Sequence, residues 1–268
     1  MFRGRLRIRV ALQNFIAWLG LLLMIASFVW WQLNSRPAET PSTPQAATGG
    51  PFALVVLDPG HGGQDSGGIC GGILEKDFTL DVAQRVDRLL QAQGIATLMT
   101  RIGDSYVSLA DRAALANRAR DSIFVSIHFN EVNKPASSGV ETYYGDHQIR
   151  PGTPLISWLP VLQRISSRSP MAESQSLAGF IQEALVVRTQ AANRGTKAGP
   201  FFVITNVWRP AVLVEGGFLT NKEDIAKLAN GEYREQIAAA ISEGILRYRD
   251  LLKQRQPALA VTAPDTTE

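Results

Sequence analysis

Short apolar runs alternate with stretches of helical periodicity along most of the chain. Residues 54–57 (LVVL) are too few for a helix and end at 58–60 (DPG), which favours a strand buried on both faces. From Asp77, a suitable N-cap, the apolar residues follow helical spacing up to 93–94. Residues 96–100 then supply a second strand. This order predicts a strand-helix-strand unit.

The same alternation continues toward the C-terminus. Ser108 and Asp111 resemble a capping box that opens another helix, and residues 123–127 form a third buried run. Further strands are predicted at 140–144, 201–204 and 211–214, and further helices at 174–189, 222–229 and 233–252. Short connections between alternating elements predict an α/β fold. We expect a single domain at 52–253, with a mostly parallel central sheet flanked by helices.

A basic segment and a long apolar run precede this domain. Residues 1–14 contain four arginines, and the 19 residues 15–33 contain no charge. The run approaches the ~20 residues that span a bilayer and exceeds the roughly 7 to 15 of a signal-peptide core. We therefore expect a transmembrane anchor, with residues 1–14 in the cytoplasm and the rest of the chain outside. The alternative is a signal sequence that is cleaved, which would leave a secreted protein.

Three other segments lack the pattern of the folded domain. Residues 34–51 are rich in Pro, Thr and Ala and predict a linker, and residues 254–268 predict a disordered tail. Residues 145–173 contain four prolines and are too long for an ordinary connection. We interpret this last segment as an insertion that serves as a lid or a docking surface.

Charge and cysteine content exclude two classes of protein. The chain carries a formal net charge of +3, but residues 1–36 hold five arginines and no acid, so the remainder has a net charge of −2. A mildly acidic domain is unsuited to phosphate backbones, and we expect no nucleic-acid partner. The single cysteine, Cys70, excludes an internal disulfide framework.

Two of the three histidines lie at the ends of predicted strands. His61 stands in 60–63 (GHGG), and His128 ends 125–128 (VSIH). In an open α/β sheet, ligands bind in the crevice at the carboxyl ends of the strands. The glycines around His61 permit tight turns and close approach of a substrate. Either histidine alone is more often structural, so the pair needs support from other residues.

A zinc hydrolase needs three ligands from His, Asp or Glu, and leaves a fourth position for water. Glu75, fourteen residues after His61, is the candidate that completes the set. Its alternative role is that of a favourable charge near a helix N-terminus.

Two further acids lie on predicted strands. Glu215 directly follows the buried run 211–214, where a carboxylate is costly unless it has a partner. It is either a general base and acid, or one half of an ion pair with Arg194 or Arg209. Glu141 is a similar acid, and the residues alone do not rank it against Glu215.

These residues belong to six blocks that occur in order along the chain. The blocks are LDPGHGG (57–63), EKD (75–77), SIHFN (126–130), GVETYY (139–144), NRG (193–195) and VLVEGGFLTN (212–221). Together they resemble the zinc-dependent N-acetylmuramoyl-L-alanine amidases of the cell-wall hydrolase type, the amidase 3 family. The resemblance covers roughly residues 53–248.

The resemblance implies a function and a role for each site residue. The reaction is zinc-dependent hydrolysis of the amide bond between N-acetylmuramic acid and L-alanine in peptidoglycan, in cell-wall remodelling or daughter-cell separation. The implied ligands of one Zn2+ per chain are His61, Glu75 and His128. Glu215 is implied as the catalytic acid and base. The residues expected to line the site or contact substrate are Asn130, Glu141 and Arg194.

The resemblance also implies partners and a location. Peptidoglycan is the substrate, and the apolar run 15–33 holds the chain at the inner membrane of the cell envelope, with the catalytic domain periplasmic or otherwise extracytoplasmic. In some relatives an insertion covers the zinc until a partner displaces it. Residues 145–173 are therefore expected to act as an autoinhibitory cover or to dock an activator protein. Neither His147 nor Glu173 in this segment is expected to reach the metal.

Three other functions compete with this interpretation. One is a zinc carboxypeptidase-like or deacylating hydrolase that uses the same ligands on another amide. Another is a non-catalytic wall-binding module, and the third is a scaffold of a division complex. The four residues that the chemistry needs are all present, which favours an enzyme.

Overall fold

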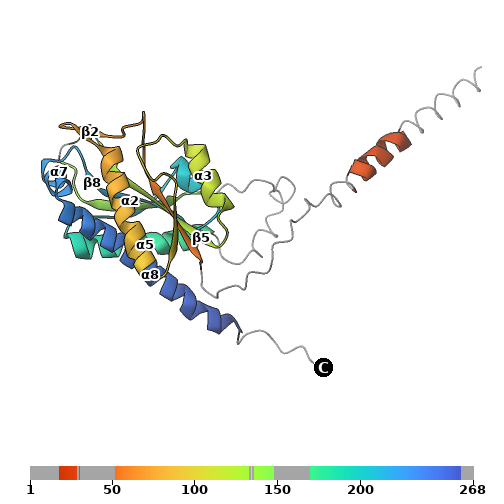
Figure 1. The fold of residues 1–268 in the computed structure, drawn as a ribbon. Coiled ribbons are helices and arrows are strands. Elements are labelled where there is room, and N and C mark those ends of the chain that lie inside the picture. The colour runs from red at the N-terminus through yellow and green to blue at the C-terminus, as the bar shows by residue number, and fades with distance from the viewer. Residues whose placement is uncertain are drawn as a thin grey trace, which may run out of the picture. The chain divides into compact units, whose positions relative to one another are not determined.

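A six-stranded sheet in the order β4-β1-β5-β8-β6-β7 forms the centre of the folded domain (Figure 1). The computed structural model describes residues 18–28, 30, 52–132, 134, 136–147 and 170–260. The strands of the sheet are β1 (Leu54–Pro59), β4 (Ala96–Met99), β5 (Ser122–Asn130), β6 (Val140–Gly145), β7 (Asn193–Gly199) and β8 (Ala211–Phe218). Neighbouring strands run parallel except β6 and β8, which are antiparallel. The predicted α/β domain with a mostly parallel sheet is confirmed.

Helices cover both faces of this sheet (Figure 1). One face carries α2 (Glu75–Ala92), α5 (Pro170–Thr189) and α8 (Gly231–Ala260). The other face carries α3 (Leu109–Arg118) and α6 (Phe202–Thr205). The remaining elements are α7 (Lys222–Ala229) and a two-stranded hairpin of β2 (Ile69–Cys70) and β3 (Ile73–Leu74).

Strand β1 shows how the sheet separates two hydrophobic cores. Val55 and Leu57 pack in the core beneath α2, α5 and α8, whereas Val56 packs in the core beneath α3 and α6. Successive side chains of a strand point to opposite faces, so a strand covered on both sides is apolar at most positions. Each fully buried aliphatic side chain contributes roughly 1.5 to 3 kcal/mol. This burial explains the continuous apolar runs that predicted the central strands.

The start of helix α2 differs from the prediction. The helix begins at Glu75 and not after Asp77, and Leu74 at the N-cap position makes no side-chain capping bond. The amide of Glu75 donates instead to the carbonyl of Gly68 at 2.9 Å, and that of Lys76 to Ser66 at 3.1 Å. These loop carbonyls satisfy the first free amides of the helix. A capping side chain is therefore not needed, and Glu75 is part of the first turn of the helix.

By contrast, the capping box predicted for α3 is confirmed. Ser108 precedes the helix in an extended conformation, and its Oγ accepts a hydrogen bond from the amide of Asp111 at 3.1 Å.

The strand predicted at 201–204 is wrong, because these residues lead into the short helix α6. The amides of Ile204 and Thr205 donate to the carbonyl of Phe201 at 3.1 and 3.0 Å, which closes one helical turn. Periodicity alone does not separate a strand from a helix in so short an apolar run. Strand β7 was not predicted at all, since it lies at the edge of the sheet and has no apolar run.

Two predicted boundaries are also corrected. Helix α5 begins at Pro170, inside the predicted insertion 145–173. Helix α8 continues to Ala260, beyond the predicted domain end at 253 and into the predicted tail. The remaining residues of these two segments, 148–169 and 261–268, lie outside the described residues.

The predicted membrane-spanning run 15–33 is described only at residues 18–28 and 30, which are helical. In the described part of the chain, no helix combines the length and the apolar character that crossing a bilayer requires. Residues 1–14 and the predicted linker 34–51 lie outside the part that the structure describes.

Candidate metal centre

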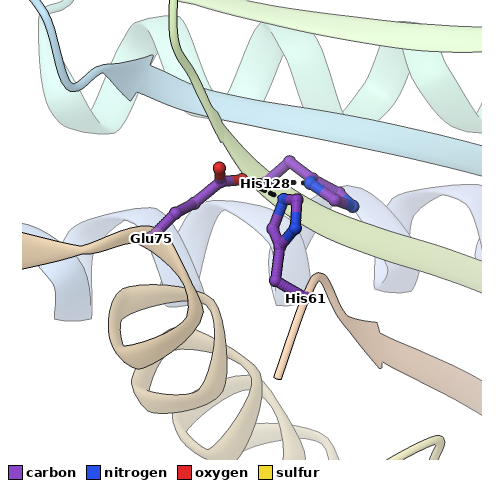
Figure 2. Close-up of side chains that lie close together, drawn as sticks. All are labelled: His61, Glu75 and His128. Atoms are coloured by element: carbon purple, nitrogen blue, oxygen red, sulfur yellow. Dashed lines mark hydrogen bonds and ion pairs between the residues drawn. The ribbon is translucent and has the colours of Figure 1, made fainter. Parts of the chain in front are cut away.

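Three side chains from distant parts of the chain converge at the carboxyl ends of β1 and β5 (Figure 2). His61 follows β1, Glu75 is the first residue of α2, and His128 lies in β5. Glu75 Oε1 lies 3.1 Å from His61 Nε2 and 3.0 Å from His128 Nδ1. One ligand atom from each residue lies within 4.8 Å of the other two. The fold therefore brings the predicted ligand set within reach of one metal ion.

The chemistry of these donors suits zinc. Two imidazole nitrogens and one carboxylate oxygen are ligands that zinc commonly takes, and three protein ligands leave one tetrahedral position for water. With metal-donor distances of about 2.0 to 2.1 Å, tetrahedral donors lie about 3.3 Å apart. The two separations at Glu75, 3.0 and 3.1 Å, are close to this value, and all three donor atoms lie within 4.8 Å of one another.

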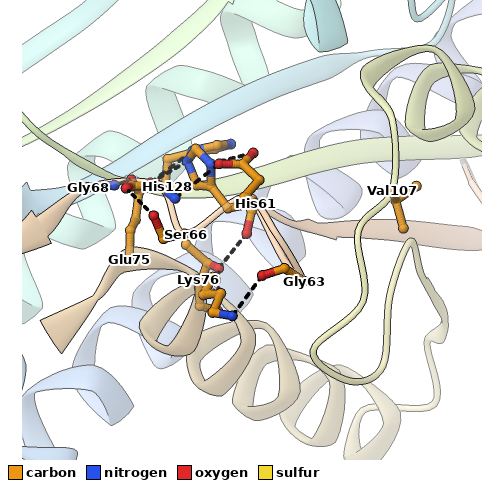
Figure 3. Close-up of polar contacts among 12 residues, drawn as sticks. His61, Gly63, Ser66, Gly68, Glu75, Lys76, Val107 and His128 are labelled. Atoms are coloured by element: carbon orange, nitrogen blue, oxygen red, sulfur yellow. Dashed lines mark hydrogen bonds and ion pairs between the residues drawn. The ribbon is translucent and has the colours of Figure 1, made fainter.

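Backbone amides hold the carboxylate of Glu75 in place, and the two histidines keep it ionised. Its side chain is buried, and Oε1 also accepts a hydrogen bond from the amide of Phe129 at 3.0 Å. The other oxygen, Oε2, accepts from the amide of Gly68 at 2.9 Å (Figure 3). Burial alone raises the pKa of Glu75, but the hydrogen bonds and charges of His128 and His61 outweigh it and set the pKa well below its ordinary value. A carboxylate that stays ionised is the form that binds metal.

His61 is oriented by an acid that was not predicted. His61 Nδ1 lies 3.0 Å from Asp65 Oδ2, which leaves Nε2 directed at Glu75. A carboxylate behind a ligating histidine fixes its tautomer and its ring orientation. Burial lowers the pKa of His61, but Glu75 and Asp65 raise it by more, so this pKa lies above its ordinary value. The signal in the sequence was an acid four residues after the histidine, in a glycine-rich segment.

Two buried arginines hold the backbone of His61, which adopts a φ of +60°. This left-handed conformation is uncommon for residues other than glycine. Arg112 donates to the carbonyl of His61 at 2.6 Å and to Asp58 Oδ1 at 2.7 Å. Arg101 donates to the carbonyl of Gly60 at 2.8 Å. Neither arginine was expected at the site, because each occurs in an ordinary polar context in the sequence.

Glu215 stands on the strand next to His128. In the parallel pairing of β5 with β8, Glu215 is directly opposite His128. Its side chain is buried, and Oε2 has no hydrogen-bond partner among the residues that the structure describes. Burial raises the pKa of Glu215 well above its ordinary value, and the charges of Glu75 and Glu141 raise it further. A buried carboxylate without a partner is costly for stability, which makes a functional role the better explanation.

In Glu141, by contrast, both carboxylate oxygens accept hydrogen bonds. Its Oε1 accepts hydrogen bonds from Asn130 Nδ2 at 2.8 Å and Tyr143 Oη at 2.9 Å. Its Oε2 accepts from Arg194 Nε at 2.9 Å and Lys197 Nζ at 2.5 Å. Burial raises the pKa of Glu141, but these partners lower it by more, to below its ordinary value. The geometry thus separates two acids that the sequence left unranked, and Arg194 pairs with Glu141 and not with Glu215.

His147 and Glu173, which were not expected to reach the metal, contact other side chains. His147 Nδ1 contacts Asp146 Oδ1 at 2.5 Å, and Glu173 accepts a hydrogen bond from Tyr248 Oη at 2.7 Å. Neither belongs to the group of side chains that can hold a metal. A cavity of about 70 Å³ beside the cluster is lined by both of its histidines and by Tyr106.

Comparison with known proteins identifies the family. The family model for N-acetylmuramoyl-L-alanine amidase (Amidase_3) matches residues 55–247. The chain belongs to this amidase family. The predicted resemblance and the predicted enzyme class are therefore confirmed.

The amidase is similar to proteins from several bacteria. It is 36% identical over 194 residues to the N-acetylmuramoyl-L-alanine amidase LytC of Bacillus subtilis. This match covers 72% of this chain and 35% of LytC. It is 31% identical over 230 residues to the amidase AmiA of Escherichia coli, with 77% of this chain and 80% of AmiA covered. The solved structure of the amidase AmiC2 of Nostoc punctiforme is 37% identical, with a TM-score of 0.62, and the match covers 74% of this chain and 97% of that structure.

Replacing Gly60 tests whether the amidase needs His128 in its observed position. A Cβ atom at Gly60 would lie 2.2 Å from His128 Cε1, whereas one at Gly103 meets nothing within 4 Å. Gly60→Ala should therefore push the His128 ring aside while the core stays folded. We expect zinc affinity to fall by about tenfold or more in calorimetric titration, with Gly103→Ala unchanged. Equal zinc affinity in folded Gly60→Ala would contradict the placement of His128 at the metal.

Proposed function

We propose that this amidase cleaves the amide bond between N-acetylmuramic acid and L-alanine in peptidoglycan, with one Zn2+ per chain held by His61, Glu75 and His128. The observation that carries the proposal is the convergence of these three donors beside a buried acid, one oxygen of which has no partner among the described residues. Family membership supports the substrate, and the donor chemistry supports zinc.

Glu215 is the acid and base of the proposed reaction. When bound, zinc supplies Lewis-acid chemistry that polarises a carbonyl and acidifies a water molecule. Glu215 takes one proton from the attacking water, and the remaining hydroxide adds to the carbonyl carbon of the lactyl group. Glu215 then delivers the proton to the leaving nitrogen as the carbon-nitrogen bond breaks. Its Oε2 is available for this proton because no described residue donates a hydrogen bond to it. The products are a glycan with a free lactyl carboxylate and a peptide that begins with L-alanine.

Asn130, Glu141 and Arg194 are proposed to line the site beside Glu215. Asn130 fixes one oxygen of Glu141, and Arg194 fixes the other. The side chain of Arg194 is 34% exposed, which leaves it accessible to substrate.

Digestion of purified peptidoglycan by the zinc-loaded enzyme distinguishes the competing functions. An amidase should release new L-alanine amino termini and leave the glycan chains and peptide crosslinks intact, as measured by end-group labelling and mass spectrometry. Cut crosslinks would favour the carboxypeptidase-like hydrolase. Binding without any product would favour the wall-binding module, and either of these results would overturn the proposal.

The variant Glu215→Gln separates catalysis from structure. Without the carboxylate no group takes the proton, so kcat should fall by about 10³-fold or more. The variant should still bind zinc, because Glu215 is not one of the three ligands. Its stability in urea unfolding should stay within about 1 kcal/mol of the wild type, because glutamine keeps the size of the side chain and the raised pKa of Glu215 already favours its neutral form. Substantial hydrolysis by the folded, zinc-loaded variant would exclude the proposed role.

We further propose that the enzyme acts in the cell envelope, anchored to the inner membrane by residues 15–33, with its catalytic domain periplasmic or extracytoplasmic. Two observations support this location: the uncharged run of 19 residues follows four arginines, and the family acts on a cell-wall substrate. Fractionation should find the full chain with membranes and a variant lacking residues 1–36 in the soluble fraction, still active. A shortened wild-type chain in the medium would show instead that the run is cleaved.

Docking of an activator on residues 145–173 stays a prediction, as does an autoinhibitory role, because 148–169 lie outside the described residues. One relative, the CwlD amidase of Clostridioides difficile, has been solved in complex with the GerS lipoprotein and is 26% identical to this chain.

A further inference from the structure

A row of polar side chains runs across neighbouring strands from the metal centre toward one edge of the sheet. His128 in β5 is paired with Glu215 in β8, and Glu215 is paired with Glu141 in β6. Residues directly opposite one another on neighbouring strands point to the same face of a sheet. The row therefore begins at a metal ligand, passes the catalytic acid and continues to Glu141. Two strand spacings place Glu141 about 10 Å from His128.

Two cations share the carboxylate of Glu141 at the far end of this row. Arg194 Nε and Lys197 Nζ, both from the edge strand β7, donate to the same oxygen, Oε2. One carboxylate balances one positive charge, so this group of three side chains has a surplus charge of +1. A structural ion pair needs only one of the two cations, and the second requires another explanation.

Both cations are fixed in position and still partly exposed. The guanidinium carbon of Arg194 lies 4.8 Å from the centre of the Phe218 ring, and Lys197 Nζ lies 5.7 Å from that of Tyr143. Their side chains are 34% and 39% exposed. Long cationic side chains usually lose much conformational entropy when they bind a ligand, and prior fixation reduces that cost. The pair is therefore arranged as a receptor for an anion.

The chemistry of the substrate indicates which anion this is. On the acyl side of the bond that is cut, the muramoyl group is neutral, whereas the peptide on the amine side carries carboxylates. Two extended residues span about 7 Å, so a carboxylate two residues away from the reacting carbonyl extends across β8 toward the head groups that contact Glu141. We propose that Arg194 and Lys197 bind the free α-carboxylate of the residue after L-alanine, and that the peptide runs from the metal across β8 and β6 toward β7. This assignment rests on the proposed function.

The test compares two disaccharide pentapeptides that differ only in that α-carboxyl group, which is a free acid in one and a primary amide in the other. The wild type should hydrolyse the acid with kcat/KM about tenfold higher than the amide, mainly through a lower KM, because charge-assisted hydrogen bonds are lost in the amide. Equal kcat/KM values for the two substrates would overturn the carboxylate subsite and leave the amidase function standing. Hydrolysis of neither substrate would overturn both.

Variants then assign the preference to the two cations. Lys197→Met and Arg194→Gln should each reduce the acid-to-amide ratio of kcat/KM by about threefold to tenfold. Lys197→Arg should retain the preference. The matched control is Lys253→Met, which removes an exposed charge on α8. An equal loss on both substrates would show that the cations serve only the structure, and if a variant fails to fold, the wild-type comparison still decides.

Discussion

The carboxylate of Glu75 is the contact on which the metal centre depends. It links the loop after β1, the start of α2 and the strand β5, because its Oε1 lies about equally far from one nitrogen of His61 and one of His128. A buried carboxylate is stable only when its oxygens are satisfied, and the amides of Phe129 and Gly68 complete that requirement. The fold thereby keeps an ionised oxygen where a cation would be held by three side chains.

Some residues around the metal centre stabilise its backbone, and others are placed to take part in the reaction. Arg112 and Arg101 are buried and donate to backbone carbonyls, which stabilises the left-handed conformation of His61. Local strain at a ligand persists only where such a network over-determines the backbone. Both oxygens of Glu141 accept hydrogen bonds, whereas one oxygen of Glu215 on the neighbouring strand has no partner in the part of the chain that the structure describes. The two acids look alike in the sequence, and their partners assign them different roles.

The sequence predicted most of the central sheet, because strands covered on both faces form nearly continuous apolar runs. It did not predict β7, an edge strand whose residues are mostly polar, or the first turn of α2, which loop carbonyls cap. The ligand set was implied by the resemblance, and the structure brings its three members together. Asp65, Arg101 and Arg112 were missed, because their importance lies in contacts across the fold that no spacing along the chain reveals.

The most direct test of the proposed metal centre is an anomalous diffraction map recorded at the zinc absorption edge from crystals of the zinc-loaded protein. We predict one strong peak at about 2.0 to 2.2 Å from His61 Nε2, Glu75 Oε1 and one nitrogen of His128, with Glu215 nearby but not bonded to the metal. A peak at another place, or a centre in which Glu215 replaces Glu75 as a ligand, would contradict it.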